Sequence, residues 1–334
     1  MNSKKLIAEI GGNHEGDFGV AKELLFSALE TDVETVKFQI YTGDSLVNKV
    51  LSPDRNLHFK KFELSIDQYK ELAELTISKG KDFNASVWSY DLFLEFKNYL
   101  SFIKIGSGDL TNYPLIEKFC QHKKPIFIST GLSYFSEVEN VVKFIESQNE
   151  FYKQPENICV LQCTSMYPIN NSDVNLAVLN RYSNFKYSVG YSDHSIGHNA
   201  LLYAYIMGAK ILEFHFTLES LRNTKEFRDH RVSLINDEVN ILTKKISEFD
   251  LMLGSDIKEP LNIELKNNHE KTFRRAIYFN KNLSAGHIVQ KEDLIYLRPF
   301  EGISPENFKD ILGKRLNKNI NMMQPLDFNF FDNG

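Results

Sequence analysis

The first part of the chain, about 250 residues, alternates short apolar runs of strand-forming residues with amphipathic segments of helical spacing. Eight strand runs occur, at 6–11, 35–40, 82–88, 102–106, 125–130, 158–164, 187–191 and 211–216. Helical periodicity lies between or after them, for example at 19–31, 66–79, 136–147 and 236–253. Several strand runs are apolar nearly throughout, as in parallel sheets covered on both faces. Eight such units predict an α/β fold, a (β/α)8 TIM barrel.

A doubly wound sheet is the competing fold, but it usually carries a glycine-rich phosphate loop, and no G-x-G-x-x-G follows the first strand run. The pattern changes after Gly254. Residues 255–271 are polar with few apolar anchors, and short strand runs follow at 276–279 and 294–297. We therefore expect a barrel over 1–254, a linker over 255–271 and a small β-rich domain over 272–334.

Composition excludes several classes of protein. The apolar fraction is 42% and the charged fraction 25%, which is ordinary for a globular protein. The net charge of −5, with no long basic run, argues against nucleic acid as a partner. None of the three cysteines lies in a C-x-x-C pair, which favours a reducing compartment. With no signal peptide and no membrane-spanning run, we expect a cytoplasmic protein without a membrane partner.

Histidine ends two neighbouring strand runs. His194 follows the seventh run and His215 lies near the end of the eighth, with one amphipathic segment, 199–207, between them. This spacing indicates adjacent parallel strands joined by a crossover helix. Two imidazoles at one end of a sheet, with Glu9 as a possible third ligand, suit a divalent metal that polarises a carbonyl. A single histidine at a strand end is more often structural, so the pair carries the argument.

Two lysines lie inside otherwise apolar strand runs. An unpaired charge at such a place costs several kcal/mol or more, so Lys37 and Lys104 should face a carboxylate or a bound anion. For Lys104 the carboxylate of Glu9 or Asp109 is an alternative partner. Small hydroxyl donors end four runs, most with glycine nearby, and suit a multiply anionic ligand: Ser86, Ser107, Ser129 and Ser192. Cys163 has no obvious base nearby and is interpreted as an apolar filler.

Seven segments occur in one series along the chain: IAEIGGNHEGD, VKFQ, IKIGSGDLTNYPLI, ISTGLS, CTSMYP, VGYSDHS and EFHFTL. In order and spacing this series resembles the sialic acid synthase, or nonulosonic acid synthase, family. The tail, RRAIYFNKNLSAGHIVQKEDLIYLRPFEGISP, is similar to the antifreeze-protein-like (SAF) domain that ends members of that family. The resemblance covers nearly the whole chain.

The resemblance implies a (β/α)8 barrel with a small β-rich SAF domain, assembled as a domain-swapped homodimer. Members of the family condense phosphoenolpyruvate with an N-acetylated aldohexose, usually N-acetylmannosamine or a deoxy diamino analogue, using Mn²⁺ or Mg²⁺. C3 of phosphoenolpyruvate attacks the open-chain aldehyde, water adds at C2, and phosphate leaves by C–O cleavage. The product is a nine-carbon 2-keto-3-deoxy acid.

The resemblance also implies roles for single residues. His194 and His215 match the metal ligands, and Glu9 matches an acid close to the metal and its water. Gln39 and Asp109 match positions on the sugar side, and Arg298 matches an arginine that reaches the partner subunit's site. The phosphoenolpyruvate side is matched by a larger set: Lys37, Ser86, Lys104, Ser107, Ser129, Tyr167 and Ser192.

Departures from the family pattern cluster on the sugar side. Asp109 stands where glutamate is common, and Ser165 stands where some members have asparagine. Asp229, in the segment 227–230, is the counterpart of an aspartate that the family usually carries in a Gly-Pro-Asp segment. Two further changes are Ala85-Ser86-Val87-Trp88 for Ser-Thr-Pro-Phe, and Phe300 for glycine. We therefore expect an aldehyde acceptor other than plain N-acetylmannosamine.

Two alternatives stay open. A 3-deoxy-ulosonate synthase acting on a shorter or phosphorylated aldose would need extra basic residues, which Arg222, Arg228 and Arg231 could supply. A catalytically idle homologue that binds a sugar acid is the other. The retained acids, lysines and histidines speak against idleness, because an idle site has little reason to keep charges inside strands.

Overall fold

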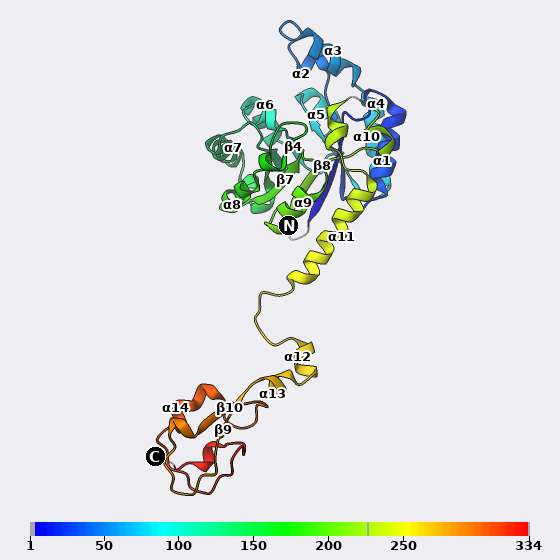
Figure 1. The fold of residues 1–334 in the computed structure, drawn as a ribbon. Coiled ribbons are helices and arrows are strands. Elements are labelled where there is room, and N and C mark those ends of the chain that lie inside the picture. Colours follow the sequence, from blue (N-terminus) through cyan, green and yellow to red (C-terminus); the bar gives the residue numbers. More distant parts are fainter. Residues whose placement is uncertain (1–3, 226, 333–334) are drawn as a thin grey trace. The chain divides into compact units, whose positions relative to one another are not determined.

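The computed structural model describes residues 4–225 and 227–332, and the chain divides into two compact units, Met1–Leu253 and Gly254–Gly334. Within the described part of the first unit, eight strands alternate with helices (Figure 1). The strands are β1 Lys5–Gly11, β2 Thr35–Ile40, β3 Asp82–Val87, β4 Ile103–Ile105, β5 Ile126–Ser129, β6 Ile158–Cys163, β7 Ser188–Asp193 and β8 Ile211–His215.

All eight strands are parallel, in the order β3-β2-β1-β8-β7-β6-β5-β4. Only the seam between β3 and β4 lacks a strand ladder in the described chain. There the side-chain amide of Asn84 donates to the carbonyl of Phe102 at 3.0 Å and joins the two edges. The strands therefore form a nearly closed barrel, and the predicted (β/α)8 fold is confirmed.

The helical segments predicted at 19–31, 66–79, 136–147 and 236–253 are all present as helices, with bounds within two residues of the prediction. Side-chain caps fix two of the starts: Asp17 accepts from the Val20 amide before α1, and Ser65 forms a capping box with Gln68 before α4. The helices are α1 Phe18–Leu29, α2 Gly43–Leu46, α3 Pro53–Lys61, α4 Ile66–Ser78, α5 Tyr90–Phe96, α6 Tyr113–Cys120, α7 Phe135–Gln148, α8 Leu179–Tyr182, α9 Asn199–Ile206, α10 Glu219–Arg222 and α11 Asn236–Leu253.

Helices α2 and α3 form an excursion between β2 and α4 that the periodicity does not predict. Thr42 and Ser45 cap α2 reciprocally, and Pro53 occupies the first turn of α3. Few of the residues in this segment are buried, and even its apolar residues are open to solvent: Val50 is 82% and Leu51 80% exposed. The segment therefore lacks the apolar stripe by which helices are recognised from sequence.

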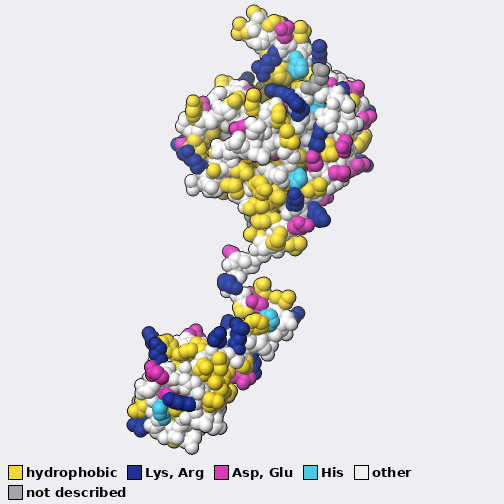
Figure 2. Space-filling view, in the orientation of Figure 1, with side chains coloured by type: hydrophobic (Ala, Val, Ile, Leu, Met, Phe, Trp, Pro, Cys, Tyr) yellow, Lys and Arg dark blue, Asp and Glu magenta, His cyan; other side chains and the backbone are white. Residues whose placement is uncertain are grey.

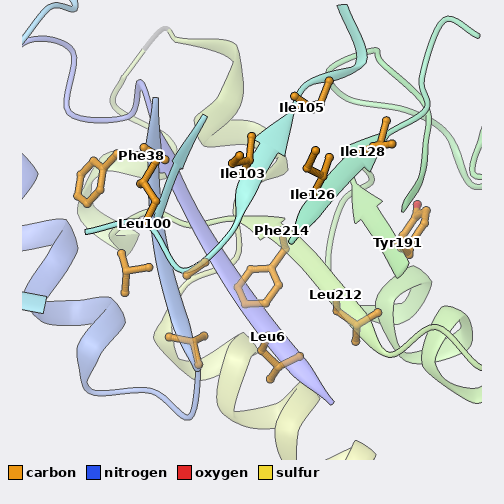
Figure 3. Close-up of a cluster of buried hydrophobic side chains, with 14 of the residues drawn as sticks. Leu6, Phe38, Leu100, Ile103, Ile105, Ile126, Ile128, Tyr191, Leu212 and Phe214 are labelled. Carbon is orange, nitrogen blue, oxygen red and sulfur yellow. The ribbon is translucent and has the colours of Figure 1, made fainter. Parts of the chain in front are cut away.

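Successive strand residues face opposite sides of the barrel wall. Outward side chains pack with the helices in one large core, and Figure 3 shows Ile103 and Ile105 of β4 beside Ile126 and Ile128 of β5 in it. Inward side chains form a separate small cluster: Ile7, Phe102, Phe127, Cys159, Leu161 and Ile211. Further along the strands, towards their carboxyl ends, the inward positions are polar.

The second unit contains an antiparallel pair, β9 Ala276–Phe279 with β10 Leu294–Leu297, at the ranges predicted. Around the pair lies a small core: Ile277, Phe279, Leu283, Val289, Leu294, Ile303, Ile311, Leu316, Ile320, Leu326 and Phe331. The unit also holds three short helices, α12 Asn262–Lys266, α13 His269–Phe273 and α14 Phe308–Ile311. The predicted linker is thus partly helical, because the Glu264 carboxylate accepts from the Leu261 amide and caps α12.

Exposed apolar side chains gather at the end of α11, where Leu251, Met252 and Leu253 are 83%, 78% and 66% exposed (Figure 2). Among the described residues, none of the helices has the length and hydropathy needed to cross a bilayer.

Candidate active site

A cavity of about 1330 Å³ opens at the carboxyl ends of the barrel strands. Its lining includes all fourteen barrel residues that the sequence analysis singles out: Glu9, Lys37, Gln39, Ser86, Lys104, Ser107, Asp109, Ser129, Ser165, Tyr167, Ser192, His194, His215 and Asp229. Arg298 belongs to the second unit, at the end of β10, with its guanidinium 5.2 Å from the ring centre of Phe273. The barrel therefore gathers the candidate residues in one place.

The floor of the cavity is a compact set of charged residues: Glu9, Lys37, Lys104 and Glu213. Lys104 Nζ lies 3.5 Å and Lys37 Nζ 3.9 Å from the same oxygen, Glu213 Oε1, and Lys37 also contacts Glu9. All four residues are at most 6% exposed. The expectation that Lys104 pairs with Glu9 or Asp109 is wrong, since its carboxylate partner is Glu213.

Two serines accept hydrogen bonds from the lysines of the floor. Lys104 Nζ donates to Ser129 Oγ at 2.7 Å, and Lys37 Nζ donates to Ser86 Oγ at 3.1 Å. Burial lowers the pKa of Lys37 to about 7, although Glu213 opposes the shift. Burial would raise the pKa of Glu213, but Lys104 and Lys37 outweigh it and hold that pKa below its usual value. A bound anion near Lys37 would favour its ammonium form and raise the pKa again.

Glu213 is the principal residue that the sequence analysis did not select. Its signal is present in the two-residue period of β8: Ile211 is in the inward cluster, so Glu213 and His215 face inward too. Ser192 Oγ donates to Glu213 Oε1 at 3.3 Å from the neighbouring strand, whereas Glu213 Oε2 is buried without a hydrogen-bond partner. One carboxylate oxygen is therefore free toward a ligand.

The two predicted metal ligands lie together, with 5.4 Å between the ring centres of His194 and His215. His194 Nδ1 lies 2.7 Å from the carbonyl of Thr164, which only accepts, so Nδ1 carries the proton and Nε2 keeps its lone pair. His215 Nδ1 is buried without a hydrogen-bond partner, 3.6 Å from Asp229 Oδ2. Burial holds the pKa of His215 well below its usual value, which leaves the neutral ring that metals bind.

This donor set fits a divalent cation held by two protein nitrogens. Two buried oxygens near the histidines also lack a hydrogen bond, Glu9 Oε1 and Asp229 Oδ1, although Arg228 Nε lies 3.4 Å from the second. Across residues 4–225 and 227–332 no three His, Cys, Asp or Glu side chains are arranged to hold a metal ion. Glu9 therefore is not placed as a third ligand; Lys37 occupies its other oxygen. The remaining coordination would come from water and substrate oxygens.

Cys163 lies against His194. Its Sγ is 3.7 Å from His194 Nδ1, and the thiol is 5% exposed on the cavity side of β6. The sequence analysis placed no imidazole near this cysteine, but the two-residue period of β6 turns Cys163 inward, next to His194, which follows β7. Because His194 Nδ1 carries the proton that it donates to the Thr164 carbonyl, the imidazole is a neighbour of the thiol and does not act as its base.

The rim of the cavity comes from the segment 43–62 and the loop 227–232. Leu46, Arg55, His58, Phe59 and Phe62 line it from the first, and Phe227 and Arg228 from the second. Ring centres of Phe62 and Phe227 are 4.8 Å apart, and those of His58 and Phe62 are 4.6 Å apart. Of these residues, only Arg228 is a candidate in the sequence analysis. His58 is exposed, and it lines the cavity as well.

Gly12 permits the two rim segments to meet. A Cβ at this position would lie 3.1 Å from Phe227 Cε1 and 3.2 Å from Phe62 Cδ1. Trp88, at the end of β3, continues the apolar surface and lies 5.4 Å from Tyr41 between ring centres. Asp109 is placed close by on the lining, and burial raises the pKa of its carboxyl. The rim thus combines aromatic faces with a few polar groups.

The three arginines considered for a phosphorylated acceptor differ in their contacts and in whether they line the cavity. Arg222 forms an ion pair with Glu238 and donates to the Ser233 carbonyl at 2.6 Å, so its guanidinium is committed. Arg231 is not among the lining residues. Arg228 lines the cavity, 4.4 Å from the ring centre of Tyr167. Arg228 is therefore the one of the three that a ligand in the cavity can contact, and its Nε also lies 3.4 Å from Asp229 Oδ1.

Two family models match the chain: the NeuB family over residues 24–258 and the SAF domain over residues 274–330. N,N'-diacetyllegionaminic acid synthase of Legionella pneumophila is 34% identical, with 94% of this chain and 91% of the relative covered. Human N-acetylneuraminate-9-phosphate synthase is 31% identical, with 93% and 88% covered. The solved N-acetylneuraminic acid synthetase of Leptospira borgpetersenii, in complex with citrate, gives a TM-score of 0.73 at 27% identity, over 81% of this chain and 92% of that one. The chain therefore belongs to the NeuB family, that of the sialic and other nonulosonic acid synthases, and carries a SAF domain at its C-terminal end.

Proposed function

We propose that this protein condenses phosphoenolpyruvate with an N-acetylated, deoxygenated aldohexose to give a nine-carbon 2-keto-3-deoxy acid and phosphate. The observation that carries the proposal is the cavity floor, where two buried lysines share the carboxylate Glu213 beside a pair of histidines. Such a floor offers ammonium groups to an anion and ring nitrogens to a cation at adjoining places. A synthase that joins an anionic enol phosphate to an aldehyde needs both.

The anionic reactant belongs at the floor. Lys37 and Lys104 supply the charge, and Ser86 and Ser129, already bonded to them, extend the row of donors. Ser107 and Ser192 line the same cavity, and Ser107 Oγ is held by the Gly131 amide at 3.1 Å. In this low-dielectric setting, charge-assisted hydrogen bonds to phosphate and carboxylate oxygens are strong.

His194 and His215 would hold Mn²⁺ or Mg²⁺, and the bound cation would supply polarisation of the acceptor's aldehyde oxygen. C3 of phosphoenolpyruvate forms the new bond to the aldehyde carbon, water adds at C2, and the C2–O bond to phosphate breaks. Glu9 Oε1, buried without a hydrogen-bond partner, would take a proton from that water, while Lys37 contacts the other oxygen. Glu213 Oε2 is the second free acceptor at the floor.

The acceptor belongs at the rim. Gln39, Asp109, Ser165 and Asp229 offer polar contacts to sugar hydroxyls and amides. The aromatic faces of Phe62, Phe227 and Trp88 favour methyl groups, such as those of acetamido and 6-deoxy substituents. The relative named as an N,N'-diacetyllegionaminic acid synthase supports an acceptor with two acetamido groups.

The deciding experiment is phosphate release from phosphoenolpyruvate with Mn²⁺ across a panel of aldoses. The panel contains N-acetylmannosamine, diacetamido-trideoxyhexoses, and phosphorylated hexoses and pentoses, with a no-acceptor and a chelated control. We expect the diacetamido sugars to give the highest kcat/KM. Best turnover of N-acetylmannosamine would refute the acceptor assignment, and best turnover of a phosphorylated aldose would move the function to a 3-deoxy-ulosonate synthase. No release with any aldose would favour a sugar-acid-binding role.

A domain-swapped homodimer, in which Arg298 serves the partner subunit's site, is part of the same proposal. Mixing two inactive variants tests it. In a heterodimer of His215→Ala with Arg298→Ala, one site would combine an intact barrel with an intact arginine from the other chain. Because about half of randomly mixed dimers are heterodimers, with one of two sites restored, about a quarter of wild-type activity should return. No recovery after subunit exchange would show that Arg298 does not act across a swapped dimer.

A further inference from the structure

Asp229 lies next to His215 although it comes from a turn. It does not lie on a strand but in the short 3-10 turn Arg228–Val232, which leaves the barrel wall after β8 and returns to it at Leu234. The carboxylate is nevertheless 3% exposed, with Oδ2 at 3.6 Å from His215 Nδ1. A turn of five residues has no regular ladder to fix it. Arg228 Nε lies 3.4 Å from Asp229 Oδ1, but Arg228 is exposed and belongs to the same turn, so the turn itself must be held from outside.

One set of hydrogen bonds ties this turn to the loop after β1. Asn13, fully buried, donates from Nδ2 to the Phe216 carbonyl at 2.9 Å and to Ser233 Oγ at 2.9 Å. Ser233 Oγ in turn donates to the Asp229 carbonyl at 2.7 Å. Asn13 therefore joins the end of β8 to the backbone of the very residue that approaches the histidine.

A second set ties the turn to β8 from the other side. His230 Nδ1 pairs with Thr217 Oγ1 at 2.7 Å, and both residues are fully buried. The Thr217 amide donates to the Leu234 carbonyl at 3.0 Å, and the Leu234 amide donates to the His215 carbonyl at 2.8 Å. The turn is thus bracketed by bonds to the strand that carries His215.

The two sets form one latch: Asn13, Thr217, His230 and Ser233. None of the four is among the residues that line the cavity, whereas His215 and Asp229, which they hold, both line it. Each of the four is at most 2% exposed, so their hydrogen bonds form without competition from water. Contact with substrate is therefore not their task.

We infer that the latch residues are positioning residues, which act on the acceptor through the placement of Asp229 beside His215. Its kinetic consequence rests on the proposed function, because Asp229 is assigned there to the acceptor. The latch also explains a feature of the sequence. Asn13 and Ser233 carry side chains that complement each other, although 220 residues separate them.

Thr217→Val tests the latch with little change in volume, since a methyl replaces the hydroxyl. We expect an acceptor KM about tenfold higher, with the phosphoenolpyruvate KM within about twofold of wild type. Thr217→Ser restores the hydroxyl and should recover most of the loss. Thr76→Val is the matched control: Thr76 is also fully buried and donates to a carbonyl, that of Leu72, but lies in α4 away from the site. Equal kinetics for Thr217→Val and this control would overturn the inference.

A double-mutant cycle separates positioning from general stability. If Thr217 acts through Asp229, its substitution should have no further effect on kcat/KM in an Asp229→Asn background. An undiminished effect there would overturn the inference. Ser233→Ala repeats the cycle through the other half of the latch, in case Thr217→Val folds poorly.

A crystal structure of Thr217→Val provides a readout that needs no turnover. The carboxylate of Asp229 should lie near His215 in the wild-type protein and be displaced from it in the variant. An undisplaced carboxylate would refute the latch even if no aldose in the panel proved to be a substrate. Silence of the wild-type enzyme with every aldose would refute the proposed function and leave this structural outcome to decide the latch.

Discussion

The floor and the rim of the cavity are built in different ways. The floor residues Glu9, Lys37, Lys104 and Glu213 all occupy inward positions of strands, and each is at most 6% exposed. The rim residues lie on short helices and loops, and several are exposed. Strand positions are fixed by ladders on both sides, whereas the rim segments depend on a few side-chain contacts. On the proposed function, the difference teaches that anion binding is built into the barrel wall. Selection of the acceptor would then depend on rim segments, whose sequence can change without destabilising the wall.

The largest effect should come from His215→Ala, which removes one of the two proposed metal ligands beside the floor. We expect activity to fall by about 10⁴-fold, because polarisation of the acceptor carbonyl contributes several kcal/mol. Mn²⁺ should no longer stimulate the residual rate, while thermal unfolding stays close to wild type. His122→Ala, at a histidine bonded to Tyr90 away from the cavity, serves as control. Near-full turnover of the variant after chelation would refute the metal assignment.

Lys104→Met tests whether the charged residues of the floor depend on one another. Glu213 would lose its nearest ammonium at 3.5 Å and Ser129 its donor, so activity should fall about a thousandfold, or about 4 kcal/mol. Lys124→Met is the matched control, since Lys124 is also partly buried but donates only to the Leu100 carbonyl. A loss below tenfold would show that Lys37 alone sustains the anion site and that the floor is less coupled than its geometry indicates.

His14, in the loop that supports the rim, gives a smaller effect on stability. Burial lowers its pKa to about 4, and Nδ1 accepts from the Gly16 amide at 3.1 Å. Because the folded pKa lies below the unfolded value of 6.5, the unfolded chain binds more protons between pH 6.5 and pH 4. Stability should therefore fall as the pH is lowered through that window, with about 2 kcal/mol lost by pH 4.5 through this histidine.

Urea unfolding at pH 7 and pH 4.5 measures that loss. His14→Gln removes the titrating ring, so the pH sensitivity should be smaller by about the same 2 kcal/mol. His269→Gln, at an exposed histidine of the second unit, should leave it unchanged. Equal pH sensitivity in wild type and His14→Gln would mean that the support of the rim is not an uncharged imidazole.

The smallest effect should come from Phe227→Ala at the rim. Loss of one aromatic face should raise the acceptor KM about fivefold, or about 1 kcal/mol, and leave the phosphoenolpyruvate KM unchanged. Phe26→Ala, at a residue of α1 that is 43% exposed, is the control. A change confined to phosphoenolpyruvate would contradict the division between floor and rim.

Prediction from sequence worked best in the strands, where apolar runs mark the element and a charged residue within such a run marks the site. The strands from β1 to β8 were located within one or two residues, because their runs are apolar on both faces. Lys37 and Lys104 were selected because a charge in such a run demands a partner. Glu213 meets the same criterion, and a strict two-residue count back from His215 would have selected it. The rim could not be found in this way, since segment 43–62 has no apolar period and Phe227 lies in a loop.

The sequence by itself determined the barrel, the small β-rich second unit, and the set of residues at the strand ends, because alternation and apolar runs are local properties of the chain. Only the tertiary structure decided which charges are partners. Glu213 rather than Glu9 meets Lys104, His194 meets Cys163, and Asn13 meets Ser233. These pairs depend on strand order and register around a nearly closed barrel. Closure of the barrel brings together residues that are 220 positions apart in the sequence, such as Asn13 and Ser233. A local sequence pattern carries no information on which distant residues will be neighbours in space.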